Sequence, residues 1–346
     1  MNEFERLTNE LKAETLPLIV YGAGNSATFA ELYLKKHNIE FEGYAVDSEY
    51  MPEKREYLGK PLFALEDYLK HGKYNILSSV SKLSNERIEQ LNRKENINKV
   101  YLIDYMGTFF PDKQLTDSDK QQLSLLRGEL CDEISKQHFD AFIRQKITLS
   151  YGKPFSMNVQ HFDSDILHFS ENEVYADCGA FDGTSVIDFV NALKQSNISS
   201  YKKIYAFECD PDNLIKLKTN ISGFDNVDII PKGLYDKTGT VRFNSTGNEY
   251  ATIGEGNIDI EVTTLDEFIG DGCCTFIKAY FESSSKCIMG AANVIKRCRP
   301  KLAIGCNHID EHLITIPMFV KELVPDYNFY FRNYSSFSGG GVLYAV

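Results

Sequence analysis

The segment from Glu173 to Ser185 constrains the fold of this chain more than any other. It begins with Val174-Tyr-Ala-Asp177, which has the apolar character of a short buried strand, and a glycine-rich turn and a helix start follow. A second acid, Glu208, closes the next apolar run, Ile204-Tyr-Ala-Phe. A strand, a tight glycine turn and an acid at the end of the following strand predict a nucleoside-binding corner in a parallel α/β sheet.

A related pattern occurs near the start of the sequence. Leu18-Ile-Val-Tyr leads into a G-x-G-x-x-A turn whose glycines are Gly22 and Gly24, and Asp47 closes the next strand. This turn could bind a dinucleotide or a nucleotide sugar, or it could be a Rossmann-like scaffold with an empty site, which we favour. No hydride-transfer constellation follows it, so a nucleotide-dependent redox enzyme is the weakest of the functions considered.

Strands that alternate with helices predict doubly wound, mostly parallel α/β sheets in two domains. We expect a Rossmann-like domain over residues 1–105, a helical connector over 106–158 and a larger domain over 159–346. The connector should pack on a domain face; an arm that covers a ligand is the alternative. We also expect Leu62–Leu69 to be helical. The last two strands, 328–334 and 342–346, are joined by a short Ser/Gly-rich turn and must be antiparallel.

Composition narrows the classes of function. The formal net charge of −12 over 346 residues argues against nucleic acid as a partner. No apolar run approaches the roughly 18 residues of a membrane span, and the N-terminus lacks a signal-peptide profile, so we expect a cytoplasmic protein.

The eight cysteines form no C-x-x-C pair. We therefore expect buried thiols rather than disulfides or a metal site, with one thiol of Cys273-Cys274 inward and the other outward.

The chemistry of the second corner suits S-adenosylmethionine (SAM). Glycines permit close backbone approach, and the helix that starts near Thr184 presents N–H groups to the carboxylate of the methionine moiety. Asp177 could hold the ammonium, directly or through water, and Glu208 could accept both ribose hydroxyls. The alternatives are structural roles, as a partner of the helix N-terminus for Asp177 and as a solvated strand end for Glu208. The expected cofactor-binding residues are Asp177, Gly179, Ala180, Phe181, Asp182, Gly183, Thr184, Glu208 and Cys209.

Several further segments follow in a recognisable order along the second half of the chain. They are Lys203–Asp210, Ile229–Leu234, Thr264–Asp266, Phe276–Lys278, Arg299–Ile304 with His308, Phe329–Tyr334 and Val342–Ala345. With Glu173–Ser185, they make residues 159–346 resemble the FkbM-type methyltransferase family. The N-terminal half resembles the small Rossmann-like domain fused to bacterial polysaccharide enzymes.

This resemblance implies a class I methyltransferase-like seven-stranded sheet that ends in an antiparallel hairpin. It also implies SAM-dependent O-methylation of a sugar or another hydroxylated compound, often in surface polysaccharide pathways. The expected partner is a small-molecule or glycan acceptor, and a homo-oligomer is left open.

The chain departs from the family where the family reads hydrophobic-Asp-hydrophobic-Glu-Gly-x-Glu. Here Tyr280 replaces the first acid, Ser283 the glycine and Ser285 the last acid, and Glu282 remains. Tyr280 cannot act as a base near neutral pH, because a phenol titrates near 10. Further on, Asn307 and Asn333 replace a tyrosine and a histidine, and the final turn, 338–341, lacks an acid.

Glu282 and His308 are therefore the candidate catalytic bases. The structural alternatives are an acid favoured by a helix N-terminus for Glu282 and a hydrogen-bonded strand-end histidine for His308. Because the lost acids concentrate at one crevice, a catalytically impaired SAM-binding or structural homologue is the alternative function.

Overall fold

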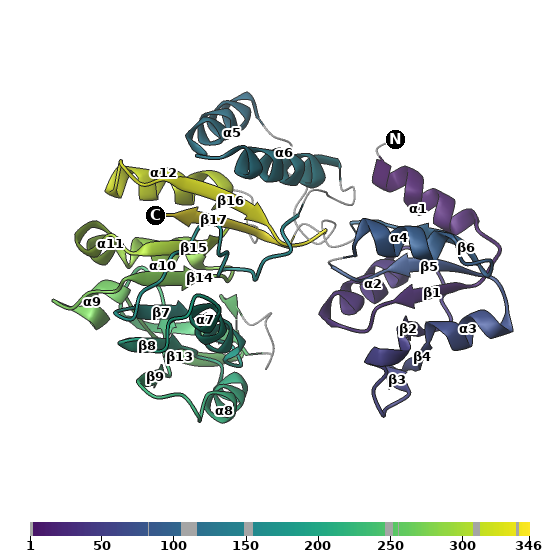
Figure 1. Ribbon diagram of the computed structural model, residues 1–346, viewed down its shortest axis with the longest axis horizontal. Coiled ribbons are helices and arrows are strands. Elements are labelled where there is room, and N and C mark those ends of the chain that lie inside the picture. The colour runs from purple at the N-terminus through teal and green to yellow at the C-terminus, as the bar shows by residue number, and fades with distance from the viewer. Residues whose placement is uncertain are drawn as a thin grey trace. The chain divides into compact units, whose positions relative to one another are not determined.

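A computed structural model describes residues 3–81, 83–104, 116–148, 155–245, 252–254, 256–306, 312–336 and 339–346. The chain forms two compact units, each with its own sheet (Figure 1). The first unit comprises Met1–Gln114, Gln137–Met157 and Asn333–Gly340, and the second comprises Leu115–Lys136, Asn158–Arg332 and Gly341–Val346. The segment expected to be a connector, 106–158, is therefore divided between the two units.

The first unit is built on a six-stranded sheet with the order β3-β4-β2-β1-β5-β6. The strands are parallel except for the β3–β4 pair. They are β1 (Leu18–Tyr21), β2 (Tyr44–Val46), β3 (Glu56–Tyr57), β4 (Lys60–Ala64), β5 (Tyr74–Ser78) and β6 (Ile97–Tyr101). The helices are α1 (Glu3–Ala13), α2 (Asn25–Lys36), η1 (Ser48–Tyr50, a 3₁₀ turn), α3 (Leu65–His71) and α4 (Asn85–Asn92). This is the doubly wound arrangement that the alternating pattern predicts.

The helix expected over Leu62–Leu69 is wrong in its first three residues, which belong to β4. The cause is a two-residue hairpin turn at Leu58-Gly59, where both residues have positive φ, 46° and 75°. Such a turn matches the twist of two antiparallel strands and forces the chain after it into a strand. Leu62 and Ala64 alternate inward with exposed neighbours, which is the strand period.

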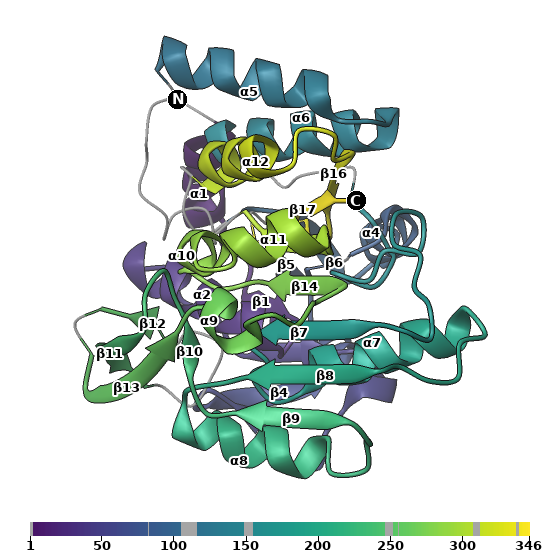
Figure 2. The same cartoon turned by 90° about the vertical axis from the view of Figure 1, so that its left-hand side faces the viewer.

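The second unit is built on a seven-stranded sheet with the order β16-β17-β15-β14-β7-β8-β9 (Figures 1 and 2). The strands are β7 (Val174–Cys178), β8 (Lys203–Phe207), β9 (Val227–Ile230), β14 (Phe276–Ala279), β15 (Lys301–Gly305), β16 (Phe329–Asn333) and β17 (Gly341–Ala345). Neighbouring strands from β15 to β9 are parallel, whereas β17 runs antiparallel to β15. The predicted sheet is confirmed, including its terminal antiparallel strand.

A smaller sheet with the order β10-β13-β11-β12 adjoins the large one (Figure 2). Its strands are β10 (Gly233–Leu234), β11 (Gly239–Asn244), β12 (Thr252–Ile253) and β13 (Ile258–Thr263). The helices from α5 onward are α5 (Asp117–Glu129), α6 (Glu133–Thr148), α7 (Thr184–Gln195), α8 (Pro211–Asn220), α9 (Leu265–Ile269), α10 (Ser284–Met289), α11 (Ala292–Cys298) and α12 (His312–Leu323). The N-cap of α5 is a capping box between Thr116 and Asp119.

Aromatic side chains fill one face of the large sheet. Tyr175 and Phe276 are register partners on β7 and β14, and their rings stack with centroids 4.9 Å apart. Phe189 of α7 and Phe162 pack against the same pair. All four side chains are nearly inaccessible to solvent, so this cluster anchors the loop that carries Phe162 to the centre of the sheet.

The expectation of free thiols is wrong for one pair, because Cys273 and Cys298 form a disulfide. Each cysteine lies three residues before a strand, and those strands, β14 and β15, are parallel with Phe276 opposite Lys301. Parallel register therefore brings the two thiols together. Cys274 is buried and Cys273 faces outward, as expected. Four other cysteines are free and buried, Cys178, Cys274, Cys287 and Cys306.

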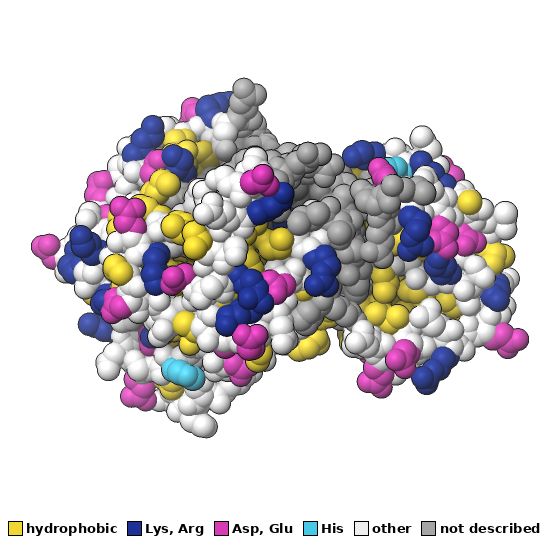
Figure 3. Space-filling view, turned by 90° about the horizontal axis from the view of Figure 1, so that it is seen from above, with side chains coloured by type: hydrophobic (Ala, Val, Ile, Leu, Met, Phe, Trp, Pro, Cys, Tyr) yellow, Lys and Arg dark blue, Asp and Glu magenta, His cyan; other side chains and the backbone are white. Residues whose placement is uncertain are grey.

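Acidic and basic side chains are intermixed on the face of the molecule drawn in Figure 3. Of the described helices, none is long and apolar enough to cross a membrane.

Candidate functional site

The glycine turn between β7 and α7 depends on backbone conformations that side chains disfavour. Gly179 and Gly183 have φ of 85° and 92°. A Cβ at Gly183 would lie 2.6 Å from Cγ2 of Ile221, so both conformation and space require glycine there. Phe181 also has positive φ, 52°. The turn lies at the carboxyl edge of the sheet, where ligands bind in this class of fold, and the ring of Phe281 packs against Gly179.

Hydrogen bonds fix the turn to the neighbouring strand. The N–H groups of Gly179 and Ala180 both donate to the carbonyl of Phe207, at 3.1 and 2.8 Å. Oδ1 of Asp182 accepts from the backbone N–H and the hydroxyl of Thr184, at 3.0 and 2.7 Å. Asp182 and Thr184 therefore hold the first turn of α7.

Glu208 follows β8 and directs its carboxylate at the glycine turn. Oε2 accepts the N–H of Phe181 at 2.8 Å, and Oε1 accepts those of Cys209 and Asp210 at 2.9 and 2.7 Å. The side chain is buried, and burial raises the pKa of Glu208 to about 7, although the three N–H groups stabilise its ionised form. A carboxylate offers roughly four acceptor positions. One position on Oε2 is left, which suits one ribose hydroxyl rather than the two expected.

Asp177 is already paired. Its carboxylate accepts a hydrogen bond from Nζ of Lys278 at 3.0 Å and another from the hydroxyl of Ser185. Nζ of Lys278 also donates to the carbonyl of Gly179 at 2.8 Å. Asp177 and Lys278 are both buried. Because the side chain of Asp177 has no exposed surface, an ammonium could contact it directly only by displacing a neighbouring group, and its observed role is to hold the turn.

The end of β14 carries the residues that differ from the family pattern. Tyr280 follows the strand, and its ring fills the space beside Gly305 of β15. Glu282 is exposed in the short segment before α10, and Ser283 is the N-cap residue of that helix. His308 lies outside the described residues. The two predicted bases are therefore not seen together, and Glu282 is placed at the surface.

Sequence reasoning missed His161 as a candidate for this site. Its ring lies against the ring of Tyr280, with centroids 4.6 Å apart and an interplanar angle of 66°. The two residues are 119 positions apart, so no spacing in the sequence could have paired them. The backbone of His161 has φ of 72°, which few residues other than glycine adopt, although histidine and asparagine do so more often than most.

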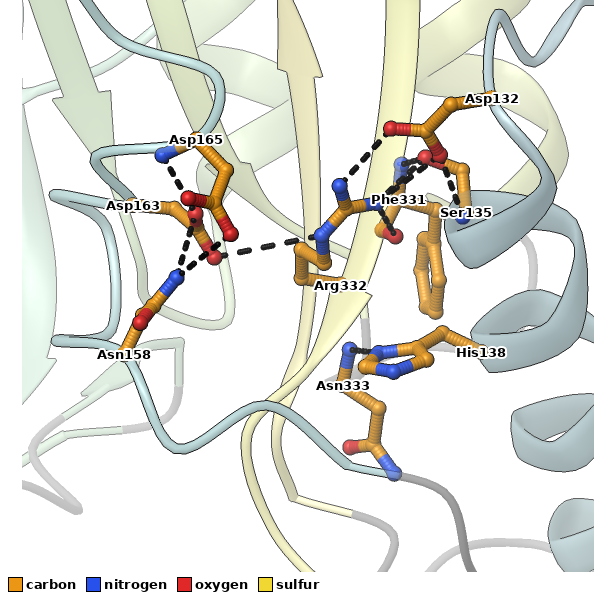
Figure 4. A network of polar contacts seen from close by, with 9 residues as sticks. All are labelled: Asp132, Ser135, His138, Asn158, Asp163, Asp165, Phe331, Arg332 and Asn333. Carbon is orange, nitrogen blue, oxygen red and sulfur yellow. Dashed lines mark hydrogen bonds and ion pairs between the residues drawn. The ribbon is translucent and has the colours of Figure 1, made fainter.

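A polar network surrounds Arg332 near the segment that carries His161 (Figure 4). Its guanidinium donates to both oxygens of Asp132, at 3.2 and 2.8 Å, and to the hydroxyl of Ser135 at 2.6 Å. Nε lies 4.0 Å from Oδ2 of Asp163. Burial alone would raise the pKa of Asp132, but hydrogen bonds from Arg332 and Ser135 lower it to about 2. The network ties the start of α6 and the 158–165 loop to β16.

The first glycine turn has different surroundings. Gly22 has φ of 116° and lies against Ser79, whereas a Cβ at Gly24 would meet no atom within 4 Å. Asp47, after β2, accepts a hydrogen bond from the hydroxyl of Tyr21 at 2.8 Å and forms an ion pair with Arg87 of α4. The carboxylate expected to face a nucleotide is therefore neutralised by a side chain of its own unit.

Comparison with solved structures extends over the whole chain. The FkbM methyltransferase from Methylobacillus flagellatus matches with a TM-score of 0.63 and 19% identity, over 99% of this chain and 98% of that one. The chain has the fold of this methyltransferase. An rRNA methylase from Streptococcus thermophilus covers 55% of this chain and 96% of its own at a TM-score of 0.34 and 12% identity, too low to add to the fold assignment. No family model and no curated protein matches the sequence.

The geometry leaves one acceptor position on Oε2 of Glu208, beside the glycine turn, which a ligand hydroxyl could take. The described residues contain no group of three His, Cys, Asp or Glu side chains that could hold a metal ion.

Proposed function

We propose that this protein is a SAM-dependent O-methyltransferase that methylates a hydroxyl of a sugar or a surface polysaccharide precursor. The observation that carries the proposal is the carboxylate of Glu208, which faces a rigid glycine turn in a fold shared with a methyltransferase. The resemblance to the FkbM-type family supports the glycan acceptor. A cytoplasmic location and a possible homo-oligomer are part of the same proposal.

The residues of the corner have separate tasks in this proposal. Glu208 would accept a ribose hydroxyl on Oε2, and the backbone between Gly179 and Gly183 would lie against the methionine moiety. The N–H of Thr184 is taken by Asp182, and the next N–H groups of the first turn of α7 would favour the carboxylate of that moiety. Lys278 fixes the turn through Gly179 and Asp177. When bound, SAM supplies a methyl group activated by its sulfonium.

Calorimetric titration with SAM and with S-adenosylhomocysteine (SAH) tests the proposal. We expect saturable binding of both by the wild-type protein and weaker binding by the Glu208→Gln variant. The Asp47→Asn variant is the matched control and should bind as the wild type does. A wild-type protein that takes up neither compound would contradict the proposal.

A catalytically impaired SAM-binding homologue is the second candidate, favoured by Tyr280, Ser283 and Ser285. The test is transfer of radiolabelled methyl from SAM to glycan acceptors by the wild type and by a triple variant, Tyr280→Asp, Ser283→Gly and Ser285→Glu. Transfer by the wild type would exclude this candidate. Transfer by the triple variant alone would support it, because the restored acids would then supply the missing chemistry.

A further inference from the structure

The loop before β7 places a histidine at the edge of the sheet where the proposed cofactor corner lies. Cys178 of β7 and Ala279 of β14 are register partners at the ends of two neighbouring strands. Gly179 and Tyr280, the residues that follow, therefore lie next to each other at the carboxyl edge of the sheet. Adjacent strands lie about 4.8 Å apart. His161 packs its ring against that of Tyr280, and it therefore lies next to the position where the family has its first acid.

The loop is fixed on both sides of His161. Phe162 is buried among the rings of Tyr175, Phe189 and Phe276. Asp163 is fully buried, accepts from the side chain of Asn158 at 2.9 Å and from the N–H of Asp165 at 3.1 Å, and faces Arg332 (Figure 4).

These anchors hold His161 at φ of 72°, a conformation that costs about 1 kcal/mol or more and persists where the surroundings impose it. Residues held in this way cluster at functional sites. The imidazole therefore has a set position beside Tyr280.

Among the described side chains beside Tyr280, this imidazole is the best suited to act as a base, and His308 lies outside the described residues. A serine hydroxyl and a phenol do not accept protons near neutral pH, and Glu282 is exposed. Histidine ordinarily titrates near 6.5, which suits a base at neutral pH. The ionisable side chains on the described elements around it include Tyr280 and Glu282 after β14, Asp163 and Asp165 in its own loop, and Arg332 of β16; the Asp177–Lys278 pair links β7 and β14.

We propose that His161 is the general base of the methyl transfer, with Tyr280 as the residue that positions its ring. This inference rests on the proposed function. As the acceptor oxygen bonds to the methyl carbon, the carbon–sulfur bond breaks and its electron pair stays on sulfur. The hydroxyl proton moves to a ring nitrogen of His161, so SAH, the methyl ether and an imidazolium are the products.

The charge of the cofactor provides a test that does not depend on an acceptor. SAM carries a positive sulfonium and SAH does not. The pKa of a base that faces the methyl group must therefore differ between the two complexes. We expect the pKa of His161, followed by NMR of ¹⁵N-histidine-labelled protein, to be lower with SAM than with SAH by roughly half a unit or more. His168, exposed in the same segment, should titrate alike in both complexes.

The His161→Asn variant completes the test, because asparagine tolerates positive φ and keeps the loop. It should retain SAM affinity within about threefold, which corresponds to roughly 0.7 kcal/mol. Equal titration of His161 with SAM and SAH would overturn the inference, and so would a loss of affinity above tenfold in this variant, which would indicate a structural role. If the wild type binds neither compound, the proposed function fails, and calorimetry shows that separately.

Discussion

The two glycine turns of this chain have the same local pattern and different surroundings. Each joins a buried strand to a helix through a glycine with positive φ, and each is followed by an acid after the next strand. Asp47 interacts with side chains: it forms an ion pair with Arg87 and accepts a hydrogen bond from the hydroxyl of Tyr21. Glu208 is held by backbone N–H groups, and among the described residues no cation pairs with it.

The difference shows that a strand–turn–helix pattern predicts the backbone but not the chemistry of its acid. An aspartate paired with a guanidinium has lost most of its attraction for a ligand, whereas a carboxylate on backbone amides keeps an open acceptor position. The second corner is therefore the better candidate for a nucleoside, although the first has the more complete glycine motif. Matched substitutions in the two turns test this comparison.

The largest difference between matched variants is expected in the free energy of unfolding, when the cation near each turn is removed. Lys278→Met leaves Asp177 buried without its partner, which should cost about 3–5 kcal/mol. Arg87→Met affects a pair that is about a quarter exposed on each side, and should cost about 1 kcal/mol. Hydrogen exchange at the amides of β7 measures the stability of the second unit, and exchange at the amides of β1 measures that of the first. Equal losses would mean that the two acids are held in equivalent ways.

The next largest difference in stability is expected when a glycine of each turn is replaced by alanine. Gly183→Ala meets both positive φ and the methyl of Ile221, and should destabilise the second unit by about 3 kcal/mol. Gly24→Ala, with negative φ and open space, should cost only about 0.5–1 kcal/mol, which is the preference of an N-cap position for glycine over alanine. Urea unfolding followed by circular dichroism measures both. A neutral Gly183→Ala variant would show that the turn is less constrained than its geometry implies.

A smaller effect is expected on cofactor affinity. Glu208→Gln should weaken SAM binding by about 10- to 100-fold, or roughly 1.4–2.7 kcal/mol, because an ionised acceptor is lost. Asp47→Asn should leave the affinity unchanged. Calorimetry at pH 8, where Glu208 is ionised, gives the clearest contrast, and equal affinities for wild type and Glu208→Gln would remove Glu208 from the site.

The smallest effect is the pH dependence of that affinity. Because the pKa of Glu208 is about 7 in the folded protein, SAM should bind more tightly as pH rises from 6 to 8. The affinity should change by at most about tenfold per pH unit below the pKa. The free energy of unfolding should show the opposite trend, because the folded state binds the proton of Glu208 more tightly than the unfolded state does. The contribution of Glu208 to stability therefore declines as pH rises from about 4.5 to 7. A pH-independent affinity would place the ribose elsewhere.

Local patterns in the sequence predicted the strands of the large sheet and its glycine turn, because each depends on residues within about ten positions. They failed where distant strands supply the partner. Lys278 and Asp177 are 101 residues apart, and the contact between His161 and Tyr280 depends on the same adjacency of β7 and β14. The disulfide between Cys273 and Cys298 likewise follows from strand order, which cysteine spacing alone does not give.

The interleaved division of the chain has a consequence for its synthesis. Six segments alternate between the two units, and the last segment of the first unit ends at Gly340. A ribosome releases the chain from its N-terminus, so the first unit cannot complete its packing until the residues up to Gly340 have emerged. A truncation after Tyr334 would therefore remove parts of both units, and neither unit can be excised as one continuous piece.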